Sequence, residues 1–209
     1  MTSRSSARSS IPTVNYHGAH KPPITAPSMD RWEGPRCTAF VHDLMSTATL
    51  PAEFDRCDVL VTDPPWQVGF DTFNTRAGVA DGRTYGAFMA RVTELVAATR
   101  VPLYLVTGRH ALAKLPAPDV VLPTRLNEDE AIVVGYRPGA EAAGNYGVAP
   151  EFLHALAQRY DVAGDFCCGY GRTARFFLRS GKEAVLSDIN PTCIGYIAQA
   201  ATTWTGRPL

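Results

Sequence analysis

The chain has 209 residues, 45% of them hydrophobic and 19% charged, which suffices for one domain with a sizeable core. Twenty Lys and Arg balance twenty Asp and Glu, and this zero net charge argues against a strongly basic nucleic-acid binder. The sequence has no apolar run of about 18 residues, so we expect no membrane-spanning helix. Arg4 and Arg8 are not followed by an apolar stretch, which argues against a secretory signal.

Residues 1–35 are rich in Ser, Pro and Thr and predict a flexible N-terminal arm, followed by a folded domain over residues 36–209. Apolar, β-branched runs predict strands over residues 38–42, 57–62, 101–106, 131–136, 161–166 and 183–187. Helical patterns occur over residues 43–50, 87–100, 111–115, 150–159 and 172–179, and from residue 191 onward. Strands and helices therefore alternate, which predicts an α/β fold with a mostly parallel sheet and helices on both faces.

The segment at residues 67–86 is polar and contains four glycines, which predicts a long flexible loop. Long loops inside compact domains are often functional. Between residues 66 and 125, seven basic side chains stand against four acidic ones. This excess is a weak indication of polyanion binding, and ordinary surface charge explains it equally well.

The five cysteines are scattered along the chain. They form no Cys-x-x-Cys pair, and none has the histidine spacing of a zinc site. We therefore expect reduced thiols in a cytoplasmic protein and no bound metal.

A glycine-rich turn follows the strand expected at residues 161–166. Gly169 and Gly171 let the backbone turn sharply and bring a ligand close to the start of the next helix. Seventeen residues after Gly171, Asp188 ends the next strand, where a carboxylate can accept both hydroxyls of a ribose. The pattern predicts a nucleotide-type cofactor without naming it, because Gly169, Gly171 and Ala174 also fit a dinucleotide fingerprint. A packing turn, with Asp188 as an ordinary helix cap, is the alternative.

Asp63-Pro64-Pro65-Trp66 follows the strand expected at residues 57–62, at the edge where open α/β sheets bind ligands. Proline lacks a backbone donor, so Pro64 presents only its carbonyl oxygen. An exocyclic amine can donate one N–H to Asp63 and the other to Pro64, which directs the nitrogen lone pair at a methyl donor. Trp66 supplies an aromatic face on which a base can stack. A simple strand-ending turn is the alternative interpretation.

Together the two motifs resemble those of the S-adenosylmethionine-dependent amino-methyltransferases, which modify adenine N6 or cytosine N4 in DNA. That family carries an Asp/Ser/Asn-Pro-Pro-Tyr/Phe/Trp motif and an Asp-x-Phe-x-Gly-x-Gly turn. Asp165, Gly169 and Gly171 match the turn, with Cys167 in place of Phe. The turn follows the catalytic motif, which is similar to the circularly permuted β-type order. Asp43 resembles the family's residue next to the cofactor adenine.

The resemblance implies a Rossmann-like methyltransferase fold in a single domain, with S-adenosylmethionine as cofactor. The implied catalytic residues are Asp63, Pro64, Pro65 and Trp66. The expected cofactor-binding residues are Asp43, Asp165, Cys167, Gly169, Gly171, Thr173, Asp188 and Asn190. We expect substrate contacts in the predicted loop, from Phe70, Phe73, Asn74, Arg76, Arg83 and Tyr85. These side chains would close over a base extruded from the duplex and touch phosphate, the alternative being an exposed loop without contacts.

DNA is the implied partner and adenine N6 the implied target, because Asp in the first motif position favours adenine. Cytosine N4 and adenine N6 in RNA are the alternatives within the same chemistry. The target-recognition region, within residues 67–148, is very short, so recognition is weak or comes from a homodimer or a separate partner. Restriction-modification in a bacterial cell or a phage-infected host is the implied setting.

Two interpretations lie outside this chemistry. A catalytically silent nucleic-acid-binding subunit would be expected to lose Asp63 or the glycines, and the chain keeps both. An NAD-dependent oxidoreductase would use the glycine turn, but it leaves Asp63-Pro64-Pro65-Trp66 unexplained and lacks a clear acid–base pair.

Overall fold

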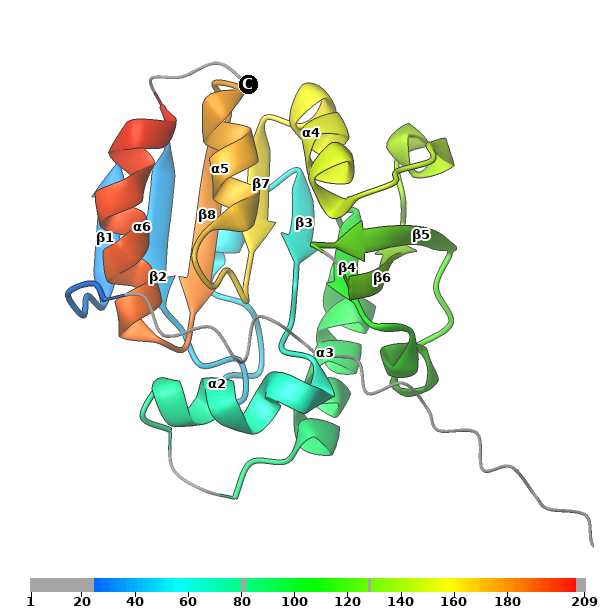
Figure 1. Cartoon of the computed structure of the whole chain (residues 1–209), viewed down its shortest axis with the longest axis horizontal. Coiled ribbons are helices and arrows are strands. Elements are labelled where there is room, and N and C mark those ends of the chain that lie inside the picture. Colours follow the sequence, from blue (N-terminus) through cyan, green and yellow to red (C-terminus); the bar gives the residue numbers. More distant parts are fainter. Residues whose placement is uncertain (1–24, 80–81, 128, 206–209) are drawn as a thin grey trace, which may run out of the picture.

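The computed structural model describes residues 25–79, 82–127 and 129–205, and an eight-stranded sheet runs through its centre (Figure 1). The strand order is β1-β2-β8-β7-β3-β4-β6-β5. The strands are β1 (Arg31–Gly34), β2 (Cys37–Val41), β3 (Val59–Thr62), β4 (Leu103–Thr107), β5 (Val120–Leu126), β6 (Asp129–Tyr136), β7 (Val162–Asp165) and β8 (Glu183–Asp188). From β2 to β4 neighbouring strands are parallel, whereas β1, β6 and β5 pair antiparallel at the two sides. The expected mostly parallel sheet is confirmed.

Helices cover both faces of this sheet (Figure 1). They are α2 (Phe70–Arg76), α3 (Tyr85–Ala98), α4 (Ala149–Arg159), α5 (Arg172–Arg179) and α6 (Pro191–Trp204). Short 3-10 segments are η1 (Ala52–Arg56), η2 (Gln67–Gly69), η3 (Arg109–Lys114) and η4 (Ala140–Ala143).

Alternation along β3 decides which helix packs on which face. Leu60 joins the core that contains Val92 of α3, whereas Val61 joins the core that contains Leu156 of α4 and Phe177 of α5. Burying one such side chain contributes about 1.5–3 kcal/mol. The fold is a single α/β domain with two helical layers, as the sequence predicted.

Residues 25–35 differ from the expected arm, of which residues 1–24 lie outside the described part of the chain. Residues 31–34 form β1, whose Trp32 pairs with Ala39 of β2, and the Met29 amide donates to the Pro191 carbonyl at 3.1 Å. The helix expected at residues 43–50 is also absent, and the segment is a series of turns. There the Asp43 carboxylate accepts the Met45 amide at 3.0 Å, a local hydrogen bond that competes with helix formation.

The loop expected at residues 67–86 was largely wrong, because η2, α2 and the first turn of α3 occupy much of it. Phe70 at the start of α2 is only 3% exposed. Its ring packs against Phe88 at 5.4 Å and against Tyr85 at 5.8 Å between centroids. These contacts with α3 supply the stability that the glycine-rich local sequence does not show.

Strand β5 was not predicted. Its residues alternate between exposed positions and partly or fully buried ones, and Pro123 lies at an exposed position within it. Proline is tolerated within an edge strand but disfavours a strand prediction from sequence, which explains why β5 was missed.

The structure also describes the state of the thiols, the grouping of potential metal ligands and the length of the apolar helices. All five cysteines are free, and burial raises the pKa of Cys37 and of Cys57 to about 12. Among the described residues no three side chains converge as metal ligands. No helix in the described part of the chain is long and apolar enough to cross a membrane.

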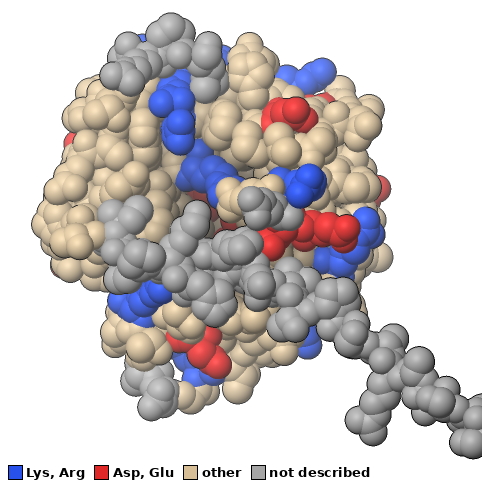
Figure 2. Space-filling model, in the orientation of Figure 1, with Lys and Arg blue, Asp and Glu red and all other residues tan. Residues whose placement is uncertain are grey.

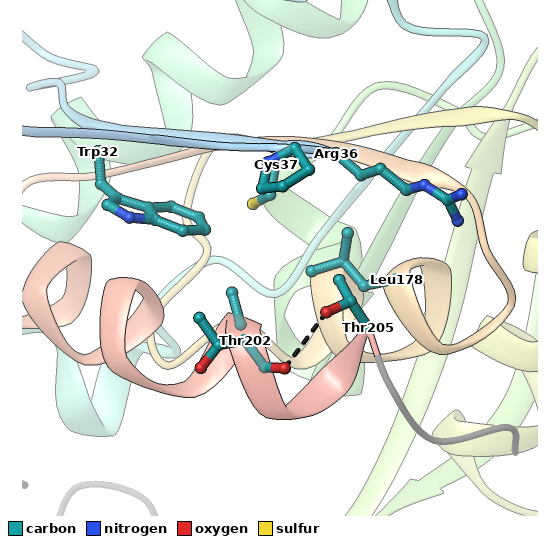
Figure 3. Close-up of a pocket in the computed structure, with 8 residues that line it drawn as sticks. Trp32, Arg36, Cys37, Leu178, Thr202 and Thr205 are labelled. Atoms are coloured by element: carbon teal, nitrogen blue, oxygen red, sulfur yellow. Dashed lines mark hydrogen bonds between the residues drawn. The ribbon is translucent and has the colours of Figure 1, made fainter.

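A hollow near the turn between β1 and β2 is lined by Trp32, Arg36, Cys37, Leu178, Thr202 and Thr205 (Figure 3). The Thr205 hydroxyl donates to the Thr202 carbonyl at 3.2 Å across part of it. Cys37 begins β2, so the hollow lies at the amino ends of the parallel strands. The residues of both sequence motifs follow the carboxyl ends, at the opposite edge.

Candidate active site

Four carboxylates line the edge of the sheet at which its parallel strands end. Asp63 directly follows β3, and Asp165 ends the neighbouring parallel strand β7. Asp188 ends β8, and Asp43 lies two residues beyond Val41, the partner of Asp188 in β2. The order along this edge is therefore Asp63, Asp165, Asp188 and Asp43. Two motifs about a hundred residues apart in the sequence meet here because β3 and β7 are neighbours.

Asp63 is under opposing influences. Burial raises the pKa of its carboxyl to about 6, while the charge of Arg172 and a hydrogen bond from Trp66 lower it. That hydrogen bond joins Trp66 Nε1 to Asp63 Oδ1 at 3.1 Å. With a pKa of about 6, Asp63 is mostly ionised at neutral pH and can accept hydrogen bonds from an amine.

Trp66 lies differently from the stacking platform that we expected. Its ring is 1% exposed and packs edge to face with His110, with centroids 6.3 Å apart. An indole buried with its N–H on a carboxylate satisfies both its apolar ring and its polar atom. Trp66 therefore holds Asp63 in place and offers no free face to a base in this structure. Pro64 is buried as well, and Pro65 is half-buried.

The glycine turn connects β7 to α5, as predicted. Gly169 and Gly171 have φ values of 49° and 76°, in the left-handed region that favours glycine. A Cβ atom on Gly171 would come within 2.9 Å of the Trp204 ring, so this glycine allows the turn to pack against α6. A Cβ atom on Gly169 would meet no atom of the described residues within 4 Å. Gly169 therefore borders open space in which a ligand can approach the backbone.

Asp165 and Asp188 hold this turn from the inside. Asp165 is 3% exposed and accepts the Thr173 hydroxyl at 2.8 Å and the Cys167 amide at 3.2 Å. Burial raises the pKa of Asp165 to about 7, against hydrogen bonds that lower it. Asp188 accepts the Gly169 amide at 2.8 Å, and burial raises its pKa as well. Asp165 is thus placed to shape the turn, while Asp188 is half-buried beside Gly169.

Asn190 caps a helix in this structure. Its side-chain oxygen accepts the Thr192 backbone amide at 3.0 Å at the start of α6. Its backbone amide donates to the Asp188 carboxylate at 2.9 Å. Asn190 is therefore the cap of α6, a role that the alternative interpretation of the sequence gave to Asp188.

Asp43, which we expected to contact a cofactor, forms an ion pair with Arg83, which we expected to contact substrate. The two guanidinium nitrogens lie 2.7 and 2.5 Å from the two carboxylate oxygens. Hydrogen bonds from Arg83 lower the pKa of Asp43. Both side chains are about a quarter exposed. The pair ties the segment ahead of α3 to the end of β2.

The other residues of the predicted loop divide between core and surface. Phe70 is buried against α3, and Asn74 donates to the Phe70 carbonyl at 3.1 Å within α2. Phe73 packs on the core as a partly buried side chain, and Tyr85 lies under Lys114. Arg76 is partly exposed at the end of α2. α2 lies across the edge at which β7 and β8 end, so the helix borders the candidate site (Figure 1). Phe70 at its start is buried against α3 and does not face the site.

Two residues near Asp63 were missed by the sequence analysis. Arg172 begins α5 immediately after Gly171, and its charge acts on Asp63. His110 is exposed beside Trp66, and burial of part of its ring lowers its pKa. A Cβ atom on Gly108 would lie 2.6 Å from the His110 ring, so glycine permits this approach. Arg172 follows β7 and His110 follows β4, the two strands next to β3. A position shortly after a strand that neighbours β3 is the signal that could have identified them.

A comparison with protein-family models gives no match, and a comparison with curated protein sequences gives none either. Solved structures share the fold. The complex of M1.HpyAVI with SAM superimposes with a TM-score of 0.50 and 8% identity, over 81% of this chain and 99% of that one. TTHA0409 of Thermus thermophilus, described as a DNA modification methylase, gives a TM-score of 0.55 and 13% identity over 82% and 95%. Its complex with S-adenosyl-L-methionine gives 0.52 and 12%, over 82% and 94%. The expected methyltransferase fold is therefore confirmed.

Proposed function

We propose that this chain transfers a methyl group from S-adenosylmethionine to the exocyclic N6 amine of adenine in DNA. The observation that carries the proposal is the meeting of Asp63-Pro64 with Gly169 and Asp188 at one edge of the sheet. The first pair of residues suits an amine and the second suits a nucleoside-type cofactor. Solved structures of the same fold that were determined with S-adenosylmethionine add support.

The residues around Gly169 suit this cofactor. Open space lies where a Gly169 side chain would stand, and the half-buried Asp188 carboxylate is hydrogen-bonded to the Gly169 amide at its border. Each carboxylate oxygen has two lone pairs, so Asp188 can also accept ribose hydroxyls. Asp165 would hold the turn between β7 and α5 in its conformation through its hydrogen bonds with Cys167 and Thr173. When bound, S-adenosylmethionine supplies a methyl group on a sulfonium, which is already activated for transfer.

Asp63 and Pro64 would position the amine. Asp63 accepts one N–H, the Pro64 carbonyl accepts the other, and the nitrogen lone pair then points at the methyl carbon. Methylation of this nitrogen by the methyl group that bound S-adenosylmethionine would supply leaves one proton to be removed from the nitrogen. Asp63 can accept that proton, since its pKa is about 6. Arg172 and Trp66 favour the ionised carboxylate that this role requires.

The choice of adenine in DNA rests on the resemblance of the motif, in which Asp favours adenine. A base in a duplex would have to be extruded to reach Asp63. His110 is exposed at the edge of the site and offers an aromatic wall for the base, a role we had expected of Trp66.

Methyl transfer from labelled S-adenosylmethionine to DNA and RNA oligomers, followed by nucleoside analysis, tests the proposal. Label on N6-methyldeoxyadenosine is the expected result. Label on cytosine N4 or on RNA adenosine would correct the substrate. Tight cofactor binding without transfer to any nucleic acid would contradict the proposal and favour a silent partner subunit.

The variant Asp63→Ala should lose about 10²- to 10⁴-fold in transfer rate, because the amine loses its positioning carboxylate. Cofactor affinity, measured by calorimetry, should stay nearly unchanged. Asp55→Asn is a matched control, since Asp55 is exposed on η1 near the other edge of the sheet. Transfer that survives in Asp63→Ala at the wild-type rate would refute the assigned role.

A further inference from the structure

We propose that Arg172, Arg175 and Arg179 of α5 form a binding row for the phosphate backbone of a nucleic acid that enters the site at Asp63. The inference rests on the proposed function and deepens it, because it names the surface that holds the polymer around the target base. It depends on side chains outside both sequence motifs, in a region from which we expected no substrate contact.

The three arginines share one face of α5. They are spaced three and four residues apart, which places them on adjacent turns of one side of a helix. The opposite side of the same helix is apolar, with Ala174, Phe177 and Leu178 buried. A rise of about 1.5 Å per residue makes the row about 10 Å long. Arg175 is exposed, and the other two are partly exposed.

Within the described part of the chain these guanidinium groups form no ion pair, although the charge of Arg172 acts on Asp63. None of the three forms an ion pair or hydrogen bond with another side chain or carbonyl of those residues. By contrast, Arg31, Arg56, Arg83 and Arg91 all form ion pairs. Like charges on adjacent helical turns repel each other, so such a row costs stability in the absence of an anion.

Lys and Arg side chains form a column over α5 that descends toward the middle of the molecule (Figure 2). This local excess stands out because the chain as a whole has zero net charge. A linear row of guanidinium groups suits a polyanion with regularly spaced phosphates, which guanidinium forks bind through paired hydrogen bonds.

The row begins at the candidate active site. Arg172 directly follows the Gly171 turn, and its charge lowers the pKa of Asp63. Arg175 and Arg179 continue away from Asp63 along the helix. A strand whose base lies at Asp63 would therefore pass its flanking phosphates over α5, which favours nucleic acid over an acidic protein or a lipid surface.

The double variant Arg175→Gln with Arg179→Gln tests the proposal and leaves Arg172 beside Asp63 in place. Binding to fluorescein-labelled DNA, single-stranded and duplex, is measured by anisotropy at a series of salt concentrations. The slope of log K against log salt should become less steep by about 0.9 for each duplex phosphate that the variant no longer neutralises, and by about 0.7 for each single-strand phosphate. In activity assays KM for the oligomer should rise several-fold, while kcat and cofactor affinity stay unchanged.

Arg31→Gln with Arg56→Gln is the matched control, because it removes the same charge from arginines that already have carboxylate partners. Arg175→Lys with Arg179→Lys keeps the charge and should retain most of the wild-type slope. An unchanged slope in the double glutamine variant, or an equal reduction in the control, would overturn the proposal. So would preferential binding of acidic peptides or anionic vesicles at these arginines. DNA binding through α5 without methyl transfer would support the row and refute only the proposed function.

Discussion

At Asp63 two neighbouring side chains act against the effect of burial. Removal from water raises the pKa of the carboxyl, whereas the Trp66 hydrogen bond and the Arg172 charge lower it, and the result is about 6. The carboxylate is therefore ionised in the neutral range but close to the pH at which it takes up a proton. A positioning carboxylate that also accepts a proton needs this balance.

Trp66→Phe should shift this balance. Without the indole N–H, Asp63 loses a hydrogen bond that favours its charged form, so its pKa should rise above the wild-type value of about 6. Activity that needs ionised Asp63 is lost as pH falls through that pKa. The acid limb of kcat/KM against pH should therefore lie near pH 6 in the wild type and at higher pH in the variant.

The same profile discriminates this role from base stacking. If Trp66 served mainly to stack the base, Trp66→Phe would raise KM for the oligomer without moving the acid limb. An acid limb at the same pH in both proteins would refute the Asp63–Trp66 coupling. Circular dichroism at the pH plateau checks that the buried ring has been replaced without loss of the fold.

The glycine turn between β7 and α5 allows a prediction that separates packing from ligand binding. Gly171→Ala should lower the free energy of unfolding by about 1–3 kcal/mol, because its Cβ would collide with the Trp204 ring in a backbone conformation that already disfavours side chains. Gly169→Ala has open space around it and should cost only the left-handed backbone penalty of about 1–2 kcal/mol.

The two variants should rank in the opposite order in cofactor affinity, with the larger loss in Gly169→Ala. The methyl group of Gly169→Ala would enter the space that we assign to the cofactor, so the Kd for S-adenosylmethionine should rise by about tenfold or more, as for a loss of about 1.4 kcal/mol. Calorimetry of binding and urea denaturation of both variants measure the two effects. Equal losses of affinity in the two variants would show that Gly169 does not border the ligand.

Arg83 and Asp43 tie the segment before α3 to the end of β2, and this tie can be measured. Asp43→Asn and Arg83→Gln should each destabilise the fold, and the double variant should lose less than the sum. We expect a coupling energy of about 0.5–3 kcal/mol, since both oxygens are hydrogen-bonded by the guanidinium. Additive losses in urea denaturation would mean that the pair contributes nothing to stability.

Elements whose signal is local were predictable from the sequence. The apolar run of β3 and the helix over residues 150–159 were correctly identified, and strand ends then located Asp63 and Asp188. Elements whose stability comes from distant contacts were not. α2 forms because Phe70 packs on α3, and β1 forms by pairing with β2.

The roles of individual site residues depended on such contacts as well. Trp66 is buried because its ring joins the core formed by side chains of β3, β4 and β6. Asp43 is paired because Arg83 reaches it from 40 residues away. A motif identifies the residue types, whereas the orientation of each side chain is decided by the elements that surround it.

For the molecule as a whole, three of the four carboxylates at this edge reduce stability at neutral pH, whereas the pKa of Asp43 is lowered by Arg83. Burial raises the pKa of Asp63, Asp165 and Asp188 above the usual value of 3.8. Between about pH 4 and pH 7 these three carboxyls therefore bind more protons in the folded state than in the unfolded state. In that range their contribution to the free energy of unfolding falls as pH rises, by up to about 1.4 kcal/mol per pH unit for each group.

Asp165→Asn isolates one of these groups, because an amide resembles the protonated carboxyl in shape and stays neutral at every pH. At pH 8, above the wild-type pKa of about 7, the variant should be more stable by about 1–3 kcal/mol. At pH 4, where wild-type Asp165 is mostly protonated in the folded state, the gain should largely disappear. Thermal unfolding at both pH values measures this, and a gain that does not depend on pH would refute the linkage. If the charged Asp165 also shapes the turn for a ligand, the stabilised variant should bind S-adenosylmethionine more weakly than the wild type. The carboxylate would then lower the stability of the fold while it increases the affinity for the cofactor.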